Sequence, residues 1–282
     1  MVSQIDPLQR LASTWDEIVR NWLDGADPWS DELRPWVDSY SGTGSSKLQV
    51  DAIPEPFSGP IDKPPKAVLL ALNPGRAFMG NELWSSGQRM SDLQSRQGRF
   101  AKEIVASGGS FTHWSSTPQD WKLLTGGPDN RFVTSRLRFV KDWLAPDPVS
   151  PADLVWFDMY PWHSYTWGSI SAKNEKVCEL IDRYVIQPIA ALSAPWVFAF
   201  GKPWFEILPA VGFVKRAELG GEDKPIWANQ TPSRRVGLFQ STTSGCWVLA
   251  MRHIGSAGPP KSSETSPLRD LICKELAILR RG

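Results

Sequence analysis

The sequence predicts an α/β fold, namely a three-layer α/β/α sandwich around a central, mostly parallel sheet of four strands. Short runs of consecutive apolar residues, typical of strands buried on both faces, recur along the chain. They occupy residues 67–72, 153–158, 196–200 and 246–251. Segments with helical spacing separate these runs, as in a parallel sheet with crossover helices. The hydrophobic fraction of 41% is sufficient for the core of such a fold.

Residues 1–60 are predicted to form a helical extension that packs on the main domain, which covers residues 61–282. The apolar residues after Pro7 recur at helical spacing, and Gly25 ends that helix. Two further segments complete the extension: a shorter helix within residues 27–40, and a long surface connection, rich in Ser, Gly and Pro, over residues 41–65.

In the main domain, helical patterns alternate with the four apolar runs. Ser91 is a suitable N-cap for the first helix, and Pro188 is expected to bend the third. The five predicted helices span residues 91–106, 131–144, 173–192, 202–208 and 266–279. Residues 213–219 and 235–241 are expected to pair with each other as additional strands.

Composition excludes several classes of protein. The net charge is only +1, so an anionic partner must be held by a local basic patch rather than by the whole-protein field. No apolar stretch is long enough for a membrane span, and the first residues do not resemble a signal peptide, which predicts a soluble, cytoplasmic protein. The three cysteines form no CxxC pair, so the sequence predicts no metal site, no iron–sulfur cluster and no other cofactor.

Four polar or glycine residues lie at or just after the ends of the four runs: Asn73, Asp158, Gly201 and His253. Ligands of open α/β sheets bind at the carboxyl ends of the strands. We therefore expect these four positions to assemble one site, with the amide of Asn73 and the imidazole of His253 facing each other across a shared cleft. The alternative for Asn73 is a purely local role, because Asn often turns the chain before a proline.

The peptides at these strand ends are LALNPG, FDMYPWHS, FAFGKPW and RHIGSAG. In this order, with helices between them, they resemble the motifs of the uracil-DNA glycosylase superfamily, in its mismatch-specific and thymine-glycosylase branch. The resemblance covers about residues 65–280. The chain departs from it after His253, where Ile254 replaces proline. The intercalating leucine of the family has no clear match here, and its candidate replacements are Ala257, Pro259 and Pro260.

The resemblance implies a monofunctional DNA glycosylase, which flips a base from the duplex and hydrolyses its N-glycosidic bond without a metal or cofactor. Asn73 would position the attacking water, and His253 would donate a hydrogen bond to the departing base. Phe78 would stack on the flipped base, with Trp84 as the alternative ring. The other expected substrate contacts are Pro74, Gly75, Trp162, His163, Gly201 and Ser256.

Asp158 suggests which base is excised. A carboxylate only accepts hydrogen bonds, and the base edge that offers it a donor is the exocyclic amine of cytosine. The favoured substrate is therefore a hypermodified cytosine of phage DNA, attacked in anti-phage defence, with Trp162 and Trp167 stacking on an attached sugar. Asp158 has two structural alternatives, as a helix cap or as the partner of a buried arginine.

Other functions remain open from sequence alone. They are repair of uracil or mismatched thymine, non-catalytic binding of nucleic acid or a nucleotide, and an unrelated small-molecule hydrolase. DNA is the expected partner in most of these interpretations, held through phosphate contacts that carry no base specificity. The cations expected to make these contacts adjoin the site peptides: Arg76, Arg252 and Lys261, with Arg89, Arg99 and Lys102 as further members of the rim.

Overall fold

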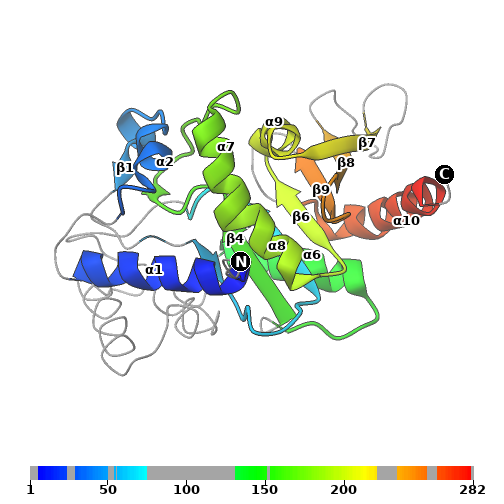
Figure 1. Ribbon diagram of the computed structural model, residues 1–282. Coiled ribbons are helices and arrows are strands. Elements are labelled where there is room, and N and C mark those ends of the chain that lie inside the picture. Colours follow the sequence, from blue (N-terminus) through cyan, green and yellow to red (C-terminus); the bar gives the residue numbers. More distant parts are fainter. Residues whose placement is uncertain are drawn as a thin grey trace.

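The computed structural model describes residues 6–23, 29–49, 54, 56–74, 131–150, 153–220, 234–252 and 259–280. Its main sheet has seven strands in the order β2-β4-β3-β6-β9-β8-β7 (Figure 1). The strands are β2 (Phe57–Ser58), β3 (Ala67–Ala71), β4 (Leu154–Asp158), β6 (Val197–Phe200), β7 (Phe213–Leu219), β8 (Arg235–Ser241) and β9 (Trp247–Arg252). A separate two-stranded sheet pairs β1 (Leu48–Gln49) with β5 (His163–Ser164).

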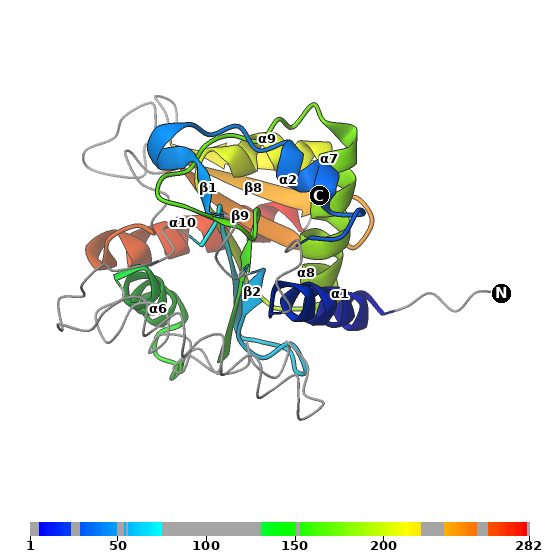
Figure 2. The ribbon, with the colours of Figure 1, turned by 90° about the vertical axis from the view of Figure 1, so that its left-hand side faces the viewer.

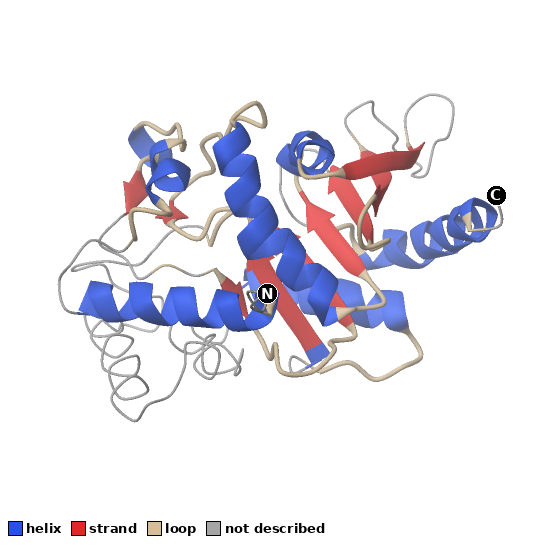
Figure 3. Cartoon of the chain, viewed as in Figure 1, coloured by secondary structure: helices blue, strands red, loops and turns tan. Residues whose placement is uncertain are grey.

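Helices form the two outer layers (Figure 3). They are α1 (Pro7–Leu23), α2 (Arg34–Asp38), α6 (Arg131–Leu144), α7 (Glu175–Ile181), α8 (Gln187–Leu192), α9 (Pro203–Ala210) and α10 (Ser262–Leu279), with a 3₁₀ turn, η1 (Gly44–Ser46), and a π-helical turn, η4 (Asp182–Ile186). Within the described part of the chain, no helix combines the length and apolarity needed to cross a bilayer.

The four apolar runs predicted from the sequence form the central strands β4, β3, β6 and β9, which pair in parallel. The α/β class is therefore confirmed, but the predicted number of four strands is wrong. β8 pairs antiparallel with β9, and β7 pairs antiparallel with β8, so this hairpin extends the sheet at one edge. β2 adds an antiparallel strand at the other edge, and its two residues are too few to show a periodic pattern.

Alternate residues of the central strands supply two separate cores. Val68 and Leu70 of β3 face the core that includes residues of α1, α7, α8 and α9, whereas Leu69 faces the core that includes residues of α6 and α10. Figure 2 shows the two helical layers on opposite sides of the sheet, seen close to edge-on. Because both faces are covered, each central strand requires apolar residues at every position, which explains the continuous apolar runs.

Several helices differ from the sequence prediction in their bounds. The third predicted helix is interrupted by η4, and Pro188 lies in the first turn of α8, where a missing N–H is tolerated. The last helix begins at Ser262 rather than at residue 266, because the Glu264 side chain accepts a hydrogen bond from the Lys261 N–H (2.9 Å). The helix predicted over residues 91–106 lies outside the described residues.

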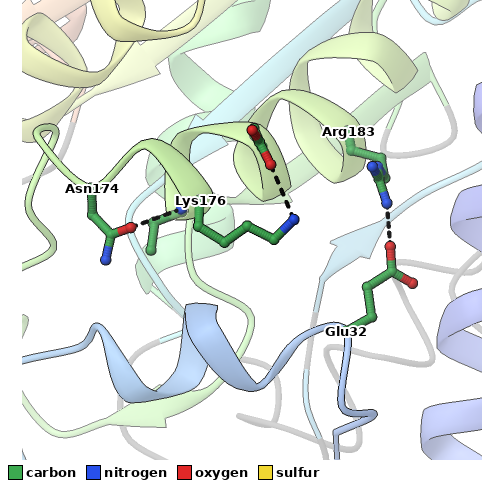
Figure 4. A network of polar contacts seen from close by, with 6 residues as sticks. Glu32, Asn174, Lys176 and Arg183 are labelled. Atoms are coloured by element: carbon green, nitrogen blue, oxygen red, sulfur yellow. Dashed lines mark hydrogen bonds and ion pairs between the residues drawn. The ribbon is translucent and has the colours of Figure 1, made fainter.

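The N-terminal segment contributes to both sheets. β1 pairs with β5, and β2 joins the main sheet. The buried side chains of Leu11 and Trp15 place one face of α1 in the main core. An ion pair between Glu32 and Arg183, a residue of η4, ties the same segment to the helical layer (Figure 4).

Candidate functional site

The carboxyl ends of the four parallel strands, β4, β3, β6 and β9, lie next to one another. The Tyr160 N–H after β4 donates to the Leu72 carbonyl after β3 (2.9 Å), and the Gly201 N–H after β6 donates to the Met251 carbonyl in β9 (2.9 Å). The Leu72 side chain lies against the α-carbon of Gly201. This contact connects the ends of β4 and β3 with the ends of β6 and β9. The strand ends therefore provide one continuous surface on which distant segments of the chain meet.

A topological switch point lies within this surface. α6, the next described helix after β3, covers one face of the sheet, whereas β6 leads directly into α9 on the opposite face. Adjacent parallel strands whose connections diverge in this way have a crevice between their carboxyl ends, where α/β proteins bind ligands. Asn73 and Gly201 border that position.

Gly201 has a backbone conformation that disfavours other residues. Its φ is +115°, and a Cβ built on it would lie 3.0 Å from Leu72 Cδ1. Glycine reaches this region without steric cost, so the chain can turn sharply from β6 into α9 beside Leu72. The predicted importance of Gly201 therefore has a structural reason, independent of any ligand.

Substituting Gly201 with alanine is expected to reduce the free energy of unfolding by about 1–3 kcal/mol, because a strained φ and a close contact with Leu72 combine. Denaturant unfolding measures this loss. Gly44→Ala is the matched control, since Gly44 also has a positive φ (+56°), but a Cβ built on it would have no atom within 4 Å. Equal losses for both variants would show that the contact with Leu72 contributes nothing.

Asn73 is almost fully buried, with 9% of its surface exposed. Its Nδ2 atom donates a hydrogen bond to Ser164 Oγ (2.9 Å), across 91 residues of sequence. This tertiary contact therefore orients the amide group. Its acceptor atom, Oδ1, faces away from Ser164. Pro74, which follows, is partly buried. This contact shows that Asn73 does more than turn the chain locally, and its role in a site stays a prediction.

Asp158 ends β4 and is paired in register with Ala71 of β3. It lies near Arg136 of α6, which is 3% exposed and whose guanidinium carbon is 5.4 Å from the centre of the Phe200 ring. Burial lowers the pKa of Arg136 to about 9, and the negative charge of Asp158 opposes that shift. The guanidinium of Arg136 is thus charged at neutral pH, and Asp158 supplies the balancing charge. This agrees with the structural alternative for Asp158, in which it is the partner of a buried arginine.

Arg136 was not predicted as a site residue, although the sequence carries a signal. It precedes Phe139, Val140 and Trp143 by three, four and seven residues, so a charge occupies the apolar stripe of its helix. A charged residue on such a stripe needs a partner in the core. Its electrostatic contact with Asp158 meets that requirement at the carboxyl end of β4.

Trp162 is a core residue, and the prediction that it stacks on a substrate is wrong. Its side chain is 0% exposed and is enclosed by three other aromatic rings, with centroid distances of 5.8 Å to Trp15, 5.7 Å to Trp36 and 4.9 Å to Tyr160. No face of the indole is left for a ligand. Trp167 is partly buried and meets the Tyr40 ring edge-on at 5.6 Å.

His163 lies in β5, where its backbone pairs with Gln49, and it is 5% exposed. Its predicted contact with a substrate stays a prediction. Two predicted cations lie at the same end of the sheet as Asn73. Arg252 ends β9 and is partly buried, opposite Arg235 of β8. Lys261, just before α10, is exposed.

The remaining predicted site residues lie outside the described residues: Gly75, Arg76, Phe78, Trp84, Arg89, Arg99, Lys102, His253, Ser256 and Ala257. The expected cleft between Asn73 and His253 therefore stays a prediction. Among the described residues, no group of three or more His, Cys, Asp or Glu side chains could hold a metal ion. The three cysteines are free thiols.

No protein-family model, curated protein or solved structure matches this chain. The class of protein that fold and site define is thus an α/β protein with a candidate ligand site at the switch point of its sheet. A more specific function has to be argued from the chemistry of that site.

Proposed function

We propose that the protein is a monofunctional DNA glycosylase that hydrolyses the N-glycosidic bond of a flipped, modified pyrimidine. The observation that carries the proposal is the position of Asn73. It is a buried amide beside the switch point of a parallel sheet, and its Nδ2 is already engaged by Ser164. An amide held in this way offers one directed acceptor to a water molecule.

In the proposed reaction, water attacks C1′ of the sugar, the bond from C1′ to the base nitrogen breaks, and the base departs with the bonding electron pair. The sugar passes through an oxocarbenium-like state, so a well-placed weak nucleophile is sufficient. Asn73 Oδ1 accepts a hydrogen bond from the water and orients it, but an amide cannot remove the proton efficiently. His253 is the proposed hydrogen-bond donor to the departing base. The attacking water releases a proton to solvent, and the base anion takes one up, so the products are the sugar hydroxyl and the neutral base.

The proposed substrate is a cytosine that carries a modification. Asp158 occupies the last register position in the pairing between β3 and β4, one strand away from the switch point between β3 and β6. Its carboxylate lies near the positive charge of Arg136, and a carboxylate accepts hydrogen bonds and donates none. Such a group suits the exocyclic amine of cytosine better than the carbonyl oxygens of uracil or thymine. A role in anti-phage defence follows if the modified base occurs in phage DNA.

The decisive experiment is a panel of duplex and single-stranded oligonucleotides that contain one modified cytosine, one uracil or one mismatched thymine. After incubation with the protein, alkaline cleavage reveals abasic sites. Cleavage at modified cytosine supports the full proposal. Cleavage at uracil or thymine alone keeps the glycosylase reaction but overturns the base assignment. Binding without abasic sites on any substrate indicates a nucleic-acid binder, and absence of binding at low salt points to a small-molecule hydrolase.

If Arg252 and Lys261 contact DNA phosphates, replacing either with glutamine should reduce the slope of log binding constant against log salt by about 0.9. Titrations of a fluorescent duplex at several salt concentrations measure this slope. Lys63→Gln is the matched control, since Lys63 is an exposed lysine shortly before β3. It therefore lies near the amino ends of the parallel strands, away from the candidate site. An equal change in all three variants would remove Arg252 and Lys261 from the interface.

A further inference from the structure

We propose that Ser164 and Tyr40 are positioning residues, which force the amide of Asn73 into the single orientation that presents Oδ1 for the reaction. This inference rests on the proposed function for its catalytic meaning. The orientation itself follows from the hydrogen bonds, and it can be tested without any assumption about the substrate. It also assigns a role to the N-terminal segment, from which Tyr40 comes.

The direction of each hydrogen bond at Ser164 is determined by its partners. Ser164 is 0% exposed, and its Oγ atom lies 2.8 Å from the Thr166 carbonyl oxygen. A carbonyl only accepts, so the single hydroxyl proton of Ser164 is donated to Thr166. The same Oγ atom also contacts Asn73 Nδ2 at 2.9 Å and the Tyr40 hydroxyl at 2.8 Å. Both of these partners must therefore act as donors.

The Tyr40 hydroxyl is held in the donating direction by the backbone. The Gly168 N–H donates to it at 2.7 Å, which leaves the phenolic proton for Ser164. A second acceptor, the Thr166 carbonyl, is more distant at 3.4 Å. A Cβ on Gly168 would lie 2.3 Å from the Ser41 carbonyl oxygen and 2.9 Å from the Tyr40 hydroxyl, so only glycine allows this close approach.

These directions leave one orientation for Asn73. If the amide were turned by 180°, its oxygen would face a serine oxygen whose only proton is committed to Thr166, and two acceptors would be in contact. Burial makes such a mismatch costly, because no water can relieve it. The NH₂ group must therefore face Ser164, and Oδ1 must face away from it. This is the acceptor that the proposed mechanism uses to orient water.

Packing around Tyr40 makes the arrangement rigid. Its ring stacks on Tyr160 with a centroid distance of 4.6 Å, and Tyr160 in turn packs against Trp162 at 4.9 Å. The antiparallel bridge between Ser41 and Ser169 fixes the backbone next to Tyr40. The buried aromatic rings thus fix the position of the Tyr40 hydroxyl, which donates to Ser164. Trp162 therefore has a structural role close to the site.

The test compares Ser164→Ala and Tyr40→Phe with wild type in the full-length chain. Ser164→Ala is expected to lower kcat about tenfold, which corresponds to the loss of one positioning hydrogen bond, with little change in KM. Tyr40→Phe is expected to lower kcat about threefold, because Ser164 keeps its bonds to Asn73 and Thr166. Two controls should stay near wild type. Tyr184→Phe removes a buried hydroxyl that contacts Thr14 and Glu32, and Ser241→Ala removes one that accepts a hydrogen bond from the Ser244 N–H (3.1 Å) at the far end of β8.

A second readout separates this inference from the proposed function. The side-chain amide of Asn73 gives a ¹⁵N–¹H signal pair, identified by its absence in Asn73→Ala. In wild type its protons should exchange slowly with water, and in Ser164→Ala they should shift and exchange faster, with a smaller effect in Tyr40→Phe and none in Tyr184→Phe. An inactive wild type with these changes would overturn only the glycosylase proposal. Unchanged amide signals in Ser164→Ala, or an unchanged kcat in an active enzyme, would overturn the positioning role.

Discussion

Asn73→Ala is expected to lower the rate of base excision by about 100-fold or more, the largest catalytic effect of any single substitution at the described site. The side chain is the proposed holder of the attacking water, and a misplaced reactant costs about this factor. Stability should fall by only about 1 kcal/mol, because one hydrogen bond to Ser164 is lost. Single-turnover cleavage of a preferred oligonucleotide, with enzyme in excess, measures the chemical step directly.

Asn174→Ala is the matched control for Asn73→Ala. Asn174 caps α7, where its side chain accepts a hydrogen bond from the Val177 N–H (3.2 Å), and it takes no part in the proposed site (Figure 4). Loss of a cap should cost about 1 kcal/mol of stability without changing the excision rate. If both variants excise bases at the wild-type rate, Asn73 does not position the water.

Trp162→Ala is expected to reduce the free energy of unfolding by about 3–5 kcal/mol, the largest stability effect among these substitutions. The indole is fully buried between Trp15, Trp36 and Tyr160, so its removal leaves a large cavity that these neighbours cannot fill. Denaturant unfolding followed by far-UV circular dichroism measures the loss. Trp162→Phe keeps an aromatic ring and should fold with a smaller loss, in case the alanine variant does not fold.

Trp167→Ala provides the comparison for a partly buried tryptophan of the same loop. It contacts Tyr40 edge-on at 5.6 Å and should lose clearly less stability than Trp162→Ala. A Trp162→Phe protein with wild-type stability and sharply weakened substrate binding would contradict the assignment of Trp162 to the core, and would restore the stacking role expected from sequence.

Local patterns predicted the elements well wherever one pattern was uninterrupted. The bounds of α6, β7 and β8 match the sequence expectation residue for residue, and the four central strands agree to within one or two residues. Each such element carries its own signal, because burial of one face or both faces imposes a period on its apolar residues. The two-residue strand β2 and the π-helical turn η4 carry no such period, and neither was predicted.

The sequence by itself determined the α/β class and the parallel pairing of apolar strands that alternate with helices along the chain. It also determined that Asn73, Asp158 and Gly201 lie at strand ends. Those properties depend on periodicity and on the residue that follows each strand. Only the tertiary structure decided that Trp162 is core, that Arg136 lies near Asp158, and that Ser164 and Tyr40 orient Asn73. The hydrogen bonds from Asn73 and Tyr40 to Ser164 join residues 91 and 124 positions apart, and they exist only once folding has brought the end of β3, the strand β5 and the N-terminal segment together.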